Sequence, residues 1–325
     1  MRERDVIERL RRLATAPEAR GLLDDVAVLD GLIITHDSIA EGVHFLPSDP
    51  PASVGWKLVA VNLSDLAGKG AAPAGALLSL TLNGNSGWES DFLTGVGHAC
   101  ESYHLALIGG DTVRLADGAP RLLGMTAIGR GGEHVPDRAG GTAGDVLWVV
   151  GTIGDAAAGL AQLVADPKAA GPLVDIYRRP VPQLGAGQVL APHAHAMMDV
   201  SDGLLLDALR MAEASRCAVS IAVDSLPLSA AFTAQRGSDL DSSLFAATGG
   251  DDYTLLAALP PALDPATLSL PEGTRVTRVG TLSAGKPQLS LSWRGKPVDL
   301  PERLGFEHSG DDVRGISAPS VGDWP

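Results

Sequence analysis

Aspartates stand beside glycines or at the ends of apolar runs throughout this sequence. These positions are Asp24, Asp25, Asp37, Asp65, Asp111, Asp199, Asp202, Asp251 and Asp252. Carboxylates at strand ends lie where loops gather, and a neighbouring glycine lets the backbone approach a ligand closely. Carboxylates that lie together repel one another unless a hard cation such as Mg²⁺ binds their oxygens. Since no matching set of cysteines and histidines accompanies them, the pattern predicts magnesium, although any one aspartate alone is more typical of a turn or a helix cap.

Two further motifs place polar groups where a ligand would bind. Ser201 and Asp202 directly precede the apolar run 204–214, which is predicted to be a helix. Capping of that helix accounts for one of the two, but it does not account for Asp199, and a helix N-terminus also suits an anion. His44, which follows the run containing Asp37, is a candidate for a substrate contact.

The common nucleotide and hydrolase motifs are absent from the sequence. Gly68-Lys69 has Leu63 where a Walker A loop needs glycine, and Gly70 where it needs serine or threonine. No GxGxxG follows a predicted strand and opens a helix, and no GxSxG marks a hydrolase nucleophile.

The elements that must position these residues alternate between helix and strand. Helical spacing of apolar residues covers 5–15, 53–67, 88–104, 154–164 and 203–215, and strands are expected at 76–82, 105–110, 121–129, 145–150, 195–199 and 217–223. Asp30-Gly31 between two β-rich runs predicts a hairpin, and shorter elements are expected at 244–248, 253–258, 274–281 and 287–293. The mixture indicates an α/β or α+β fold.

Length and composition divide the chain and exclude several classes of protein. The 325 residues fit two domains, and the glycine-rich stretch 131–144 predicts the boundary between residues 1–138 and 139–308. Residues 309–325 are rich in Ser, Gly, Asp and Pro and are expected to form a mobile tail. The net charge of −14 disfavours a nucleic-acid partner, and the two cysteines cannot form a disulfide framework. Because no apolar run is typical of a secretory signal or a membrane span, a cytoplasmic location is expected.

An ordered set of motifs over residues 20–308 resembles the thiamine-monophosphate kinase family, within the superfamily of aminoimidazole ribonucleotide synthetase. These motifs are Asp24–Ala27, Thr35–Asp37, Gly42–Phe45, Ala60–Ala67, Ile108–Thr112, Asp199–Leu204 and Gly249–Tyr253. The resemblance implies ATP-dependent phosphorylation of thiamine monophosphate to thiamine diphosphate, with several Mg²⁺ ions. It also implies an N-terminal mixed-sheet domain, 1–138, that binds ATP and Mg²⁺ and forms a homodimer, and a C-terminal α/β domain, 139–308.

The resemblance also implies roles for particular residues, all of them ligands of metal, nucleotide or substrate. The metal ligands would be Asp25, Thr35, His36, Asp37, Asp65, Asp111, Asp199 and Asp202. The ATP contacts would be Gly110, Asp111, Arg138 and Ser201, and the substrate contacts would be His44, Asp251 and Phe306. Three positions depart from the family pattern. Leu23 stands where the family has Gly, His36 where it has Ser or Thr, and Asp251 where it has Glu.

The acceptor of such a reaction is already an anionic phosphate oxygen, so no strong general base is needed. We therefore expect a direct in-line transfer without a covalent enzyme intermediate. Two alternatives remain open at this point. One is another ATP-dependent enzyme of the same superfamily that acts on a different substrate, and the other is a non-catalytic protein that binds Mg-nucleotide or thiamine phosphates.

Overall fold

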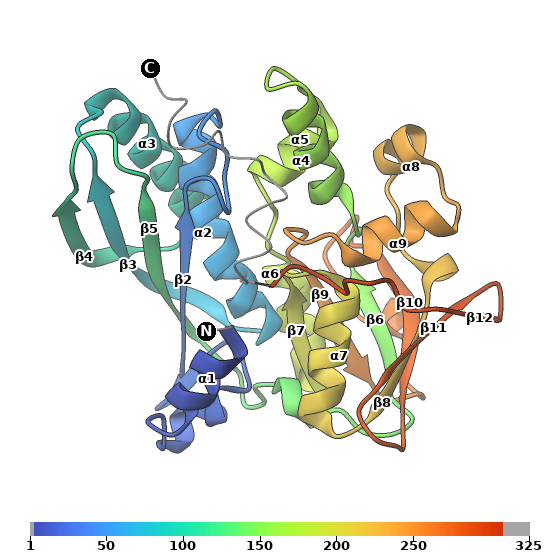
Figure 1. Ribbon diagram of the computed structural model, residues 1–325. Coiled ribbons are helices and arrows are strands. Elements are labelled where there is room, and N and C mark those ends of the chain that lie inside the picture. Colours follow the sequence, from blue (N-terminus) through green and yellow to red (C-terminus); the bar gives the residue numbers. More distant parts are fainter. Residues whose placement is uncertain (1–2, 308–325) are drawn as a thin grey trace.

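Two β-sheets, each covered by helices, organise the chain into two mixed α/β units (Figure 1). The computed structural model describes residues 3–307, so the tail predicted at 309–325 lies outside the described residues. The α/β fold class expected from the sequence is confirmed. No helix in the described part of the chain is long and apolar enough to cross a membrane.

The first sheet has the strand order β1-β2-β5-β3-β4. Its strands are β1 (Ala27–Leu29), β2 (Leu32–Ala40), β3 (Ala72–Leu82), β4 (Leu107–Arg114) and β5 (Leu122–Arg130). Only β3 and β4 pair in parallel. Asp30 and Gly31 link β1 to β2 with φ angles of 50° and 78°, as the hairpin prediction requires.

One face of this sheet is covered by the long helix α2 (Pro51–Gly68), which packs against α3 (Ser86–Ser102). Proline suits the first turn of α2, where its missing N–H leaves no bond unmade. The opposite face of the sheet is open, and every residue of β4 is exposed. Strand alternation therefore decides which side chains point towards α2 and which point away from it.

The second sheet has the strand order β12-β11-β8-β10-β6-β9-β7. Its strands are β6 (Val146–Val150), β7 (Ala196–Val200), β8 (Ala218–Ala222), β9 (Thr254–Leu259), β10 (Val276–Ser283), β11 (Leu289–Trp293) and β12 (Lys296–Val298). All neighbouring strands are antiparallel except β11 and β8. The remaining helices are α1 (Glu3–Arg11), α4 (Asp155–Ala165), α5 (Pro172–Arg178), α6 (Leu184–Leu190), α7 (Leu204–Ser215), α8 (Ala230–Arg236) and α9 (Leu240–Thr248).

The two faces of the second sheet pack against different partners. Residues of α4, α7, α8 and α9 share one apolar cluster with strand residues such as Met198 and Leu256. On the other face, residues of α6 and Ala67 of α2 pack with Met197 and Leu255. Helix α2 is therefore enclosed between the two units, which explains why nearly all of its residues are buried (Figure 1).

The structure also shows where the sequence patterns were insufficient. Residues 244–248 belong to helix α9, and helices α5, α6 and α8 were not expected at all. Each of these three helices has seven residues, which is too short to display a reliable apolar repeat. The first helix ends at Arg11, although the spacing predicted that it would continue to residue 15.

Candidate functional site

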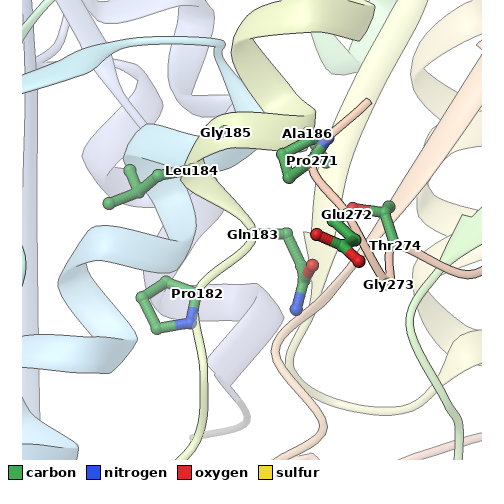
Figure 2. A pocket seen from close by; sticks show the side chains of 9 residues that line it. All are labelled: Pro182, Gln183, Leu184, Gly185, Ala186, Pro271, Glu272, Gly273 and Thr274. Atoms are coloured by element: carbon green, nitrogen blue, oxygen red, sulfur yellow. The ribbon is translucent and has the colours of Figure 1, made fainter. Parts of the chain in front are cut away.

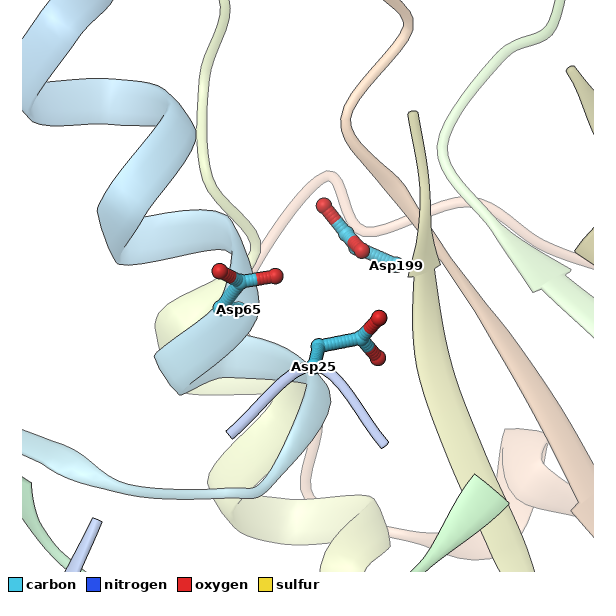
Figure 3. Close-up of side chains that lie close together, drawn as sticks. All are labelled: Asp25, Asp65 and Asp199. Atoms are coloured by element: carbon cyan, nitrogen blue, oxygen red, sulfur yellow. The ribbon is translucent and has the colours of Figure 1, made fainter. Parts of the chain in front are cut away.

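Three predicted metal ligands meet at the junction of the two units. One carboxylate oxygen from each of Asp25, Asp65 and Asp199 lies within 4.8 Å of the others (Figure 3). Asp25 precedes β1, Asp65 lies on α2, and Asp199 lies near the end of β7. The cluster thus depends on the way the second sheet packs against α2.

Two residues of β2 extend this cluster from the face that meets α2. Thr35 is buried, and its hydroxyl donates a hydrogen bond to the Asp65 carboxylate. The backbone N–H of Asp37 donates to Oδ1 of Asn62 on α2 at 2.9 Å, which fixes this strand against the helix. Thr35 and Asp37 are two positions apart on one strand, so both side chains point in the same direction.

Burial and mutual repulsion perturb the acidic groups of this cluster. Burial, followed by Asp25 and Asp202, raises the pKa of Asp37 to about 6. Burial, followed by neighbouring carboxylates, also raises the pKa values of Asp65 and Asp199 well above their usual range. These shifts indicate carboxylates crowded together in a way that a bound cation would relieve.

Asp25 differs from its neighbours because two cationic side chains lie beside it. Burial tends to raise its pKa, but Arg138 and Lys69 together hold that pKa below the ordinary value. Arg138 forms an ion pair with Oδ1 of Asp25, whereas Lys69 Nζ lies 3.7 Å from Oδ2. Lys69 Nζ approaches Asp24 more closely, at 2.5 Å, so Asp24 is held in its own ion pair.

The donor set of the cluster fits a hard divalent cation. Oδ2 of Asp25 is buried and has no hydrogen-bond partner among residues 3–307. The converging ligands are carboxylate oxygens with a threonine hydroxyl beside them, and Mg²⁺ prefers oxygen ligands. The residues that would hold the cation are therefore Asp25, Asp65 and Asp199, with Thr35 and Asp37 adjoining them.

A network within the first turns of α7 shapes the segment that carries Ser201 and Asp202. Oδ2 of Asp207 accepts the backbone N–H groups of both residues at 3.1 Å. Arg210 forms ion pairs with Asp202 and with Asp207, the latter at 3.1 Å. The N-cap of α7 is Gly203 and has no side-chain cap, so the expectation that Ser201 or Asp202 caps the helix was wrong.

Three other predicted ligands lie away from the cluster within this chain. His36 is exposed beside Thr126 of β5, with Nδ1 2.9 Å from its hydroxyl, and it points away from Thr35 and Asp37. Gly110 and Asp111 lie on the exposed edge strand β4. β4 is the third strand along from β2 in the sheet, and neighbouring strands lie about 4.8 Å apart. Asp111 therefore lies about 14 Å from the strand that carries Asp37. Within one chain, the structure does not bring these residues to the cluster.

The predicted substrate contacts are arranged around a residue that sequence reasoning missed. Nζ of Lys57, on α2, lies 2.9 Å from the backbone oxygen of His44 and 2.9 Å from Oδ2 of Asp251. The backbone N–H of Phe306 donates to the carbonyl of Asp202 at 2.8 Å, so Phe306 lies beside the segment that precedes α7. His44 and Asp251 are thus brought together, and Phe306 is placed near Asp202.

The second aspartate of the pair 251–252 has a structural role. The Asp252 carboxylate accepts the N–H of Gly154 at 2.7 Å and that of Ala156 at 3.3 Å, which caps the N-terminus of α4. The two residues that the sequence analysis did not identify, Lys57 and Asp207, share one signal. Each is a charged residue within an otherwise apolar helical run, a position that requires a partner.

A separate pocket lies between the segment leading into α6 and the loop before β10. It has a volume of about 260 Å³ and is lined by Pro182, Gln183, Leu184, Gly185, Ala186, Pro271, Glu272, Gly273 and Thr274 (Figure 2). Glu272 is the only charged side chain in this lining, and none of the predicted site residues belongs to it. The carboxylate cluster, rather than this pocket, is therefore the candidate site.

Comparisons with known proteins show which family the chain belongs to. The family model for the N-terminal domain of AIR synthase related protein matches residues 23–131, and the model for the C-terminal domain matches residues 142–291. The thiamine-monophosphate kinase of Caulobacter vibrioides is 36% identical over 329 residues, which cover 94% of this chain and 90% of the relative. That of Escherichia coli strain K12 is 37% identical over 304 residues, covering 89% and 91% respectively.

A solved structure has a similar fold over nearly the whole chain. AaThiL, in complex with AMPPCP and TMP, superposes with a TM-score of 0.82 at 30% sequence identity. The match covers 95% of this chain and 97% of the AaThiL chain.

Proposed function

This chain belongs to the thiamine-monophosphate kinase family, and we propose that it transfers the terminal phosphoryl group of ATP to thiamine monophosphate, forming thiamine diphosphate and ADP. The observation that carries the proposal is the convergence of Asp25, Asp65 and Asp199 from both units. The relatives named above and the AaThiL complex with AMPPCP and TMP support the choice of donor and acceptor.

The main task of the protein in this reaction is to bring two anionic phosphates together in the correct geometry. Mg²⁺ held by Asp25, Asp65 and Asp199 would supply charge neutralisation between donor and acceptor. Arg138 lies beside Asp25, and its guanidinium suits a donor phosphate once Asp25 is satisfied by a cation. The Asp207 carboxylate binds the backbone of Ser201 and Asp202 and so holds this segment in a fixed position.

The transfer is direct and in line, because the acceptor oxygen is already anionic and requires no strong base. Direct transfer inverts the configuration at phosphorus, so the reaction can be followed with ATP that is chiral at its terminal phosphorus. Inversion is the expected result. Retention of configuration, or isolation of a phosphorylated enzyme, would contradict direct transfer.

Product analysis tests the proposed activity itself. The purified protein is incubated with ATP and Mg²⁺ and with either thiamine monophosphate or thiamine, and the products are separated by chromatography. Metal-dependent formation of thiamine diphosphate from the monophosphate alone is expected. Calorimetric binding of both ligands without turnover would instead identify a non-catalytic binding protein.

We also propose that the chain acts as a homodimer through the open face of its first sheet. Apolar side chains are exposed there, among them Leu77 at 40%, Ile108 at 61% and Leu122 at 55%. Asp111 lies on β4 of the same sheet, too far from the cluster of its own chain to bind the same ion. If the partner copy packs so that its β4 reaches the edge of this sheet beside the cluster, Asp111 of one copy would complete the site of the other, and this would account for its place among the predicted ligands.

A further inference from the structure

Lys57 is a buried lysine that the proposed chemistry does not yet use. Its side chain is 2% exposed, and it lies on α2, where the neighbouring residues are mostly apolar. Burial of an ammonium group is costly unless hydrogen bonds and an opposite charge compensate for it. The partners of Lys57 should therefore show what this position requires.

All three N–H donors of the ammonium group have a partner to which they can be directed. Nζ lies 2.9 Å from the carbonyl oxygen of His44 and 2.9 Å from Oδ2 of Asp251. The third partner is the ring of Tyr177 on α5, whose centroid lies 4.0 Å from Nζ. Lys57 thus joins a loop of the first unit to two segments of the second unit.

The Asp251 carboxylate is held from both sides. Lys57 binds Oδ2, while the hydroxyl of Tyr253 donates to Oδ1 at 3.0 Å. The Asp251 backbone has a φ of 68°, a left-handed conformation that fixes the direction in which its short side chain leaves the chain. The side chain remains 24% exposed, and each oxygen keeps a lone pair for a further donor.

We propose that Lys57 is a positioning residue of the acceptor site, an inference that rests on the proposed function. Lys57 fixes the Asp251 carboxylate and the His44 loop relative to each other, so that both contact the same acceptor molecule. Because its own donors are engaged, Lys57 acts through these two residues and is not itself a phosphate ligand. The acceptor that such a site suits carries a positive charge and, on a separate group, N–H donors, which the remaining lone pairs of Asp251 would bind.

Steady-state kinetics with two substitutions test this role. Lys57→Met keeps the length of the side chain but removes its charge and its N–H donors. Lys57→Arg keeps the positive charge and the N–H donors. Since a hydrogen bond to a charged group contributes about 1.5–3 kcal/mol, Lys57→Met should raise KM for thiamine monophosphate about 10- to 100-fold. KM for ATP should stay within about twofold, and Lys57→Arg, which keeps a positive charge and N–H donors at this position, should recover part of the loss.

A double-mutant cycle with Asp251→Asn separates positioning from general damage. If Lys57 acts through Asp251, the double variant should raise KM for thiamine monophosphate no more than the more affected single variant does. Additive effects would overturn the proposal, as would an equal rise in KM for both substrates. Val219→Ala, a core substitution on β8, provides a control that lowers the thermal midpoint without a change in either KM.

The failure of this inference can be distinguished from the failure of the proposed function. The positioning role alone would be overturned if the wild-type protein phosphorylates thiamine monophosphate and the Lys57→Met variant has the same KM for it. Wild-type protein that neither binds nor phosphorylates thiamine monophosphate would overturn both. Calorimetric titration of that acceptor, in the presence of AMPPCP, would detect binding where turnover is not observed.

Discussion

Asp65 of α2 and Asp199 of β7 face each other across the junction of the two units, with a carboxylate oxygen of each within 4.8 Å of the other. Asp65 is 7% exposed and Asp199 3%, and burial together with the nearby carboxylates raises both pKa values. Such a pair destabilises the folded protein when no cation is bound. Fold stability and metal binding should therefore be linked at this site.

The first prediction concerns pH. The pKa of Asp37 is about 6 in the folded protein, against an ordinary value of 3.8. At pH values between 3.8 and about 6, the Asp37 carboxyl binds more protons in the folded state than in the unfolded state. Its contribution to the free energy of unfolding therefore falls as pH rises through this range. Because Mg²⁺ competes with these protons, its apparent affinity should increase as pH rises through about 6.

Thermal denaturation with and without Mg²⁺, at several pH values from 5 to 8, checks this linkage. The stabilisation by Mg²⁺ should be small at the acidic end and should grow towards the alkaline end. Asp37→Asn should weaken this pH dependence. A constant Mg²⁺ effect across the range would contradict the predicted competition.

A second prediction is that Asp65→Asn separates stability from activity. The amide keeps the shape of the carboxylate and removes one of the repelling charges, so the metal-free variant should gain about 1 kcal/mol in free energy of unfolding. Turnover should fall by about 100-fold or more, because the cation loses a ligand. Urea denaturation and turnover measurements on the same preparation check both effects.

The matched control for Asp65→Asn is Asp91→Asn, an exposed residue of α3. It removes one negative charge at a site away from the cluster, so neither the free energy of unfolding nor the turnover should change appreciably. Near-normal turnover of Asp65→Asn would refute the assigned metal role.

The third prediction tests the proposed contribution of Asp111 to the site of a partner protomer. Asp111→Asn and Asp65→Asn should each be nearly inactive as homodimers. When the two variants are mixed and reassembled, each heterodimer contains one site without substitutions, so activity should recover to about a quarter of the wild-type value.

If Asp111 served its own chain, every site of the heterodimer would carry one substitution. Activity would then stay at the level of the separate variants. A different affinity tag on each variant allows the heterodimer to be purified from the mixture, so an unchanged activity of that heterodimer can be attributed to the placement of Asp111.

A fourth prediction separates the adjacent residues Asp251 and Asp252. Asp252→Ala removes the cap of α4 and should lower the free energy of unfolding by about 1–3 kcal/mol, while KM for thiamine monophosphate changes little. Asp251→Asn should have the opposite profile, with a raised KM and little loss of stability. Denaturation and kinetics on both variants check the division.

Asp252→Asn refines this comparison. Burial raises the pKa of Asp252 well above its usual range, so the neutral amide is a close substitute for the native side chain. A stability loss as large as that of Asp252→Ala would show that the cap depends on a negative charge.

The sequence allowed the prediction of those features that depend on local pattern. The hairpin at Asp30-Gly31 follows from turn chemistry, and the long helix α2 follows from its apolar spacing. The meeting of Asp25, Asp65 and Asp199 agrees with the pattern of acidic motifs. Each of these motifs carries its signal within a few neighbouring residues.

Other features depend on contacts between distant segments and could not be read from one sequence. Lys57 is paired with Asp251, which lies in the other unit, and nothing near Lys57 along the chain indicates that partner. His36 falls in a motif with Thr35 and Asp37, but strand alternation turns its side chain to the other face. Recognition of a motif therefore assigned residues to one site without assigning a direction to each side chain.

The enclosure of α2 between the two units affects the order in which the protein can mature. During synthesis the first sheet and α2 emerge before α6 and β7, the segments that cover the remaining side of α2. Until those segments follow, α2 has an uncovered apolar side, and Asp199 is not yet available to the acidic cluster. The nascent first unit is thus incomplete on the ribosome, and its acidic cluster can be completed only after much of the second unit has been translated.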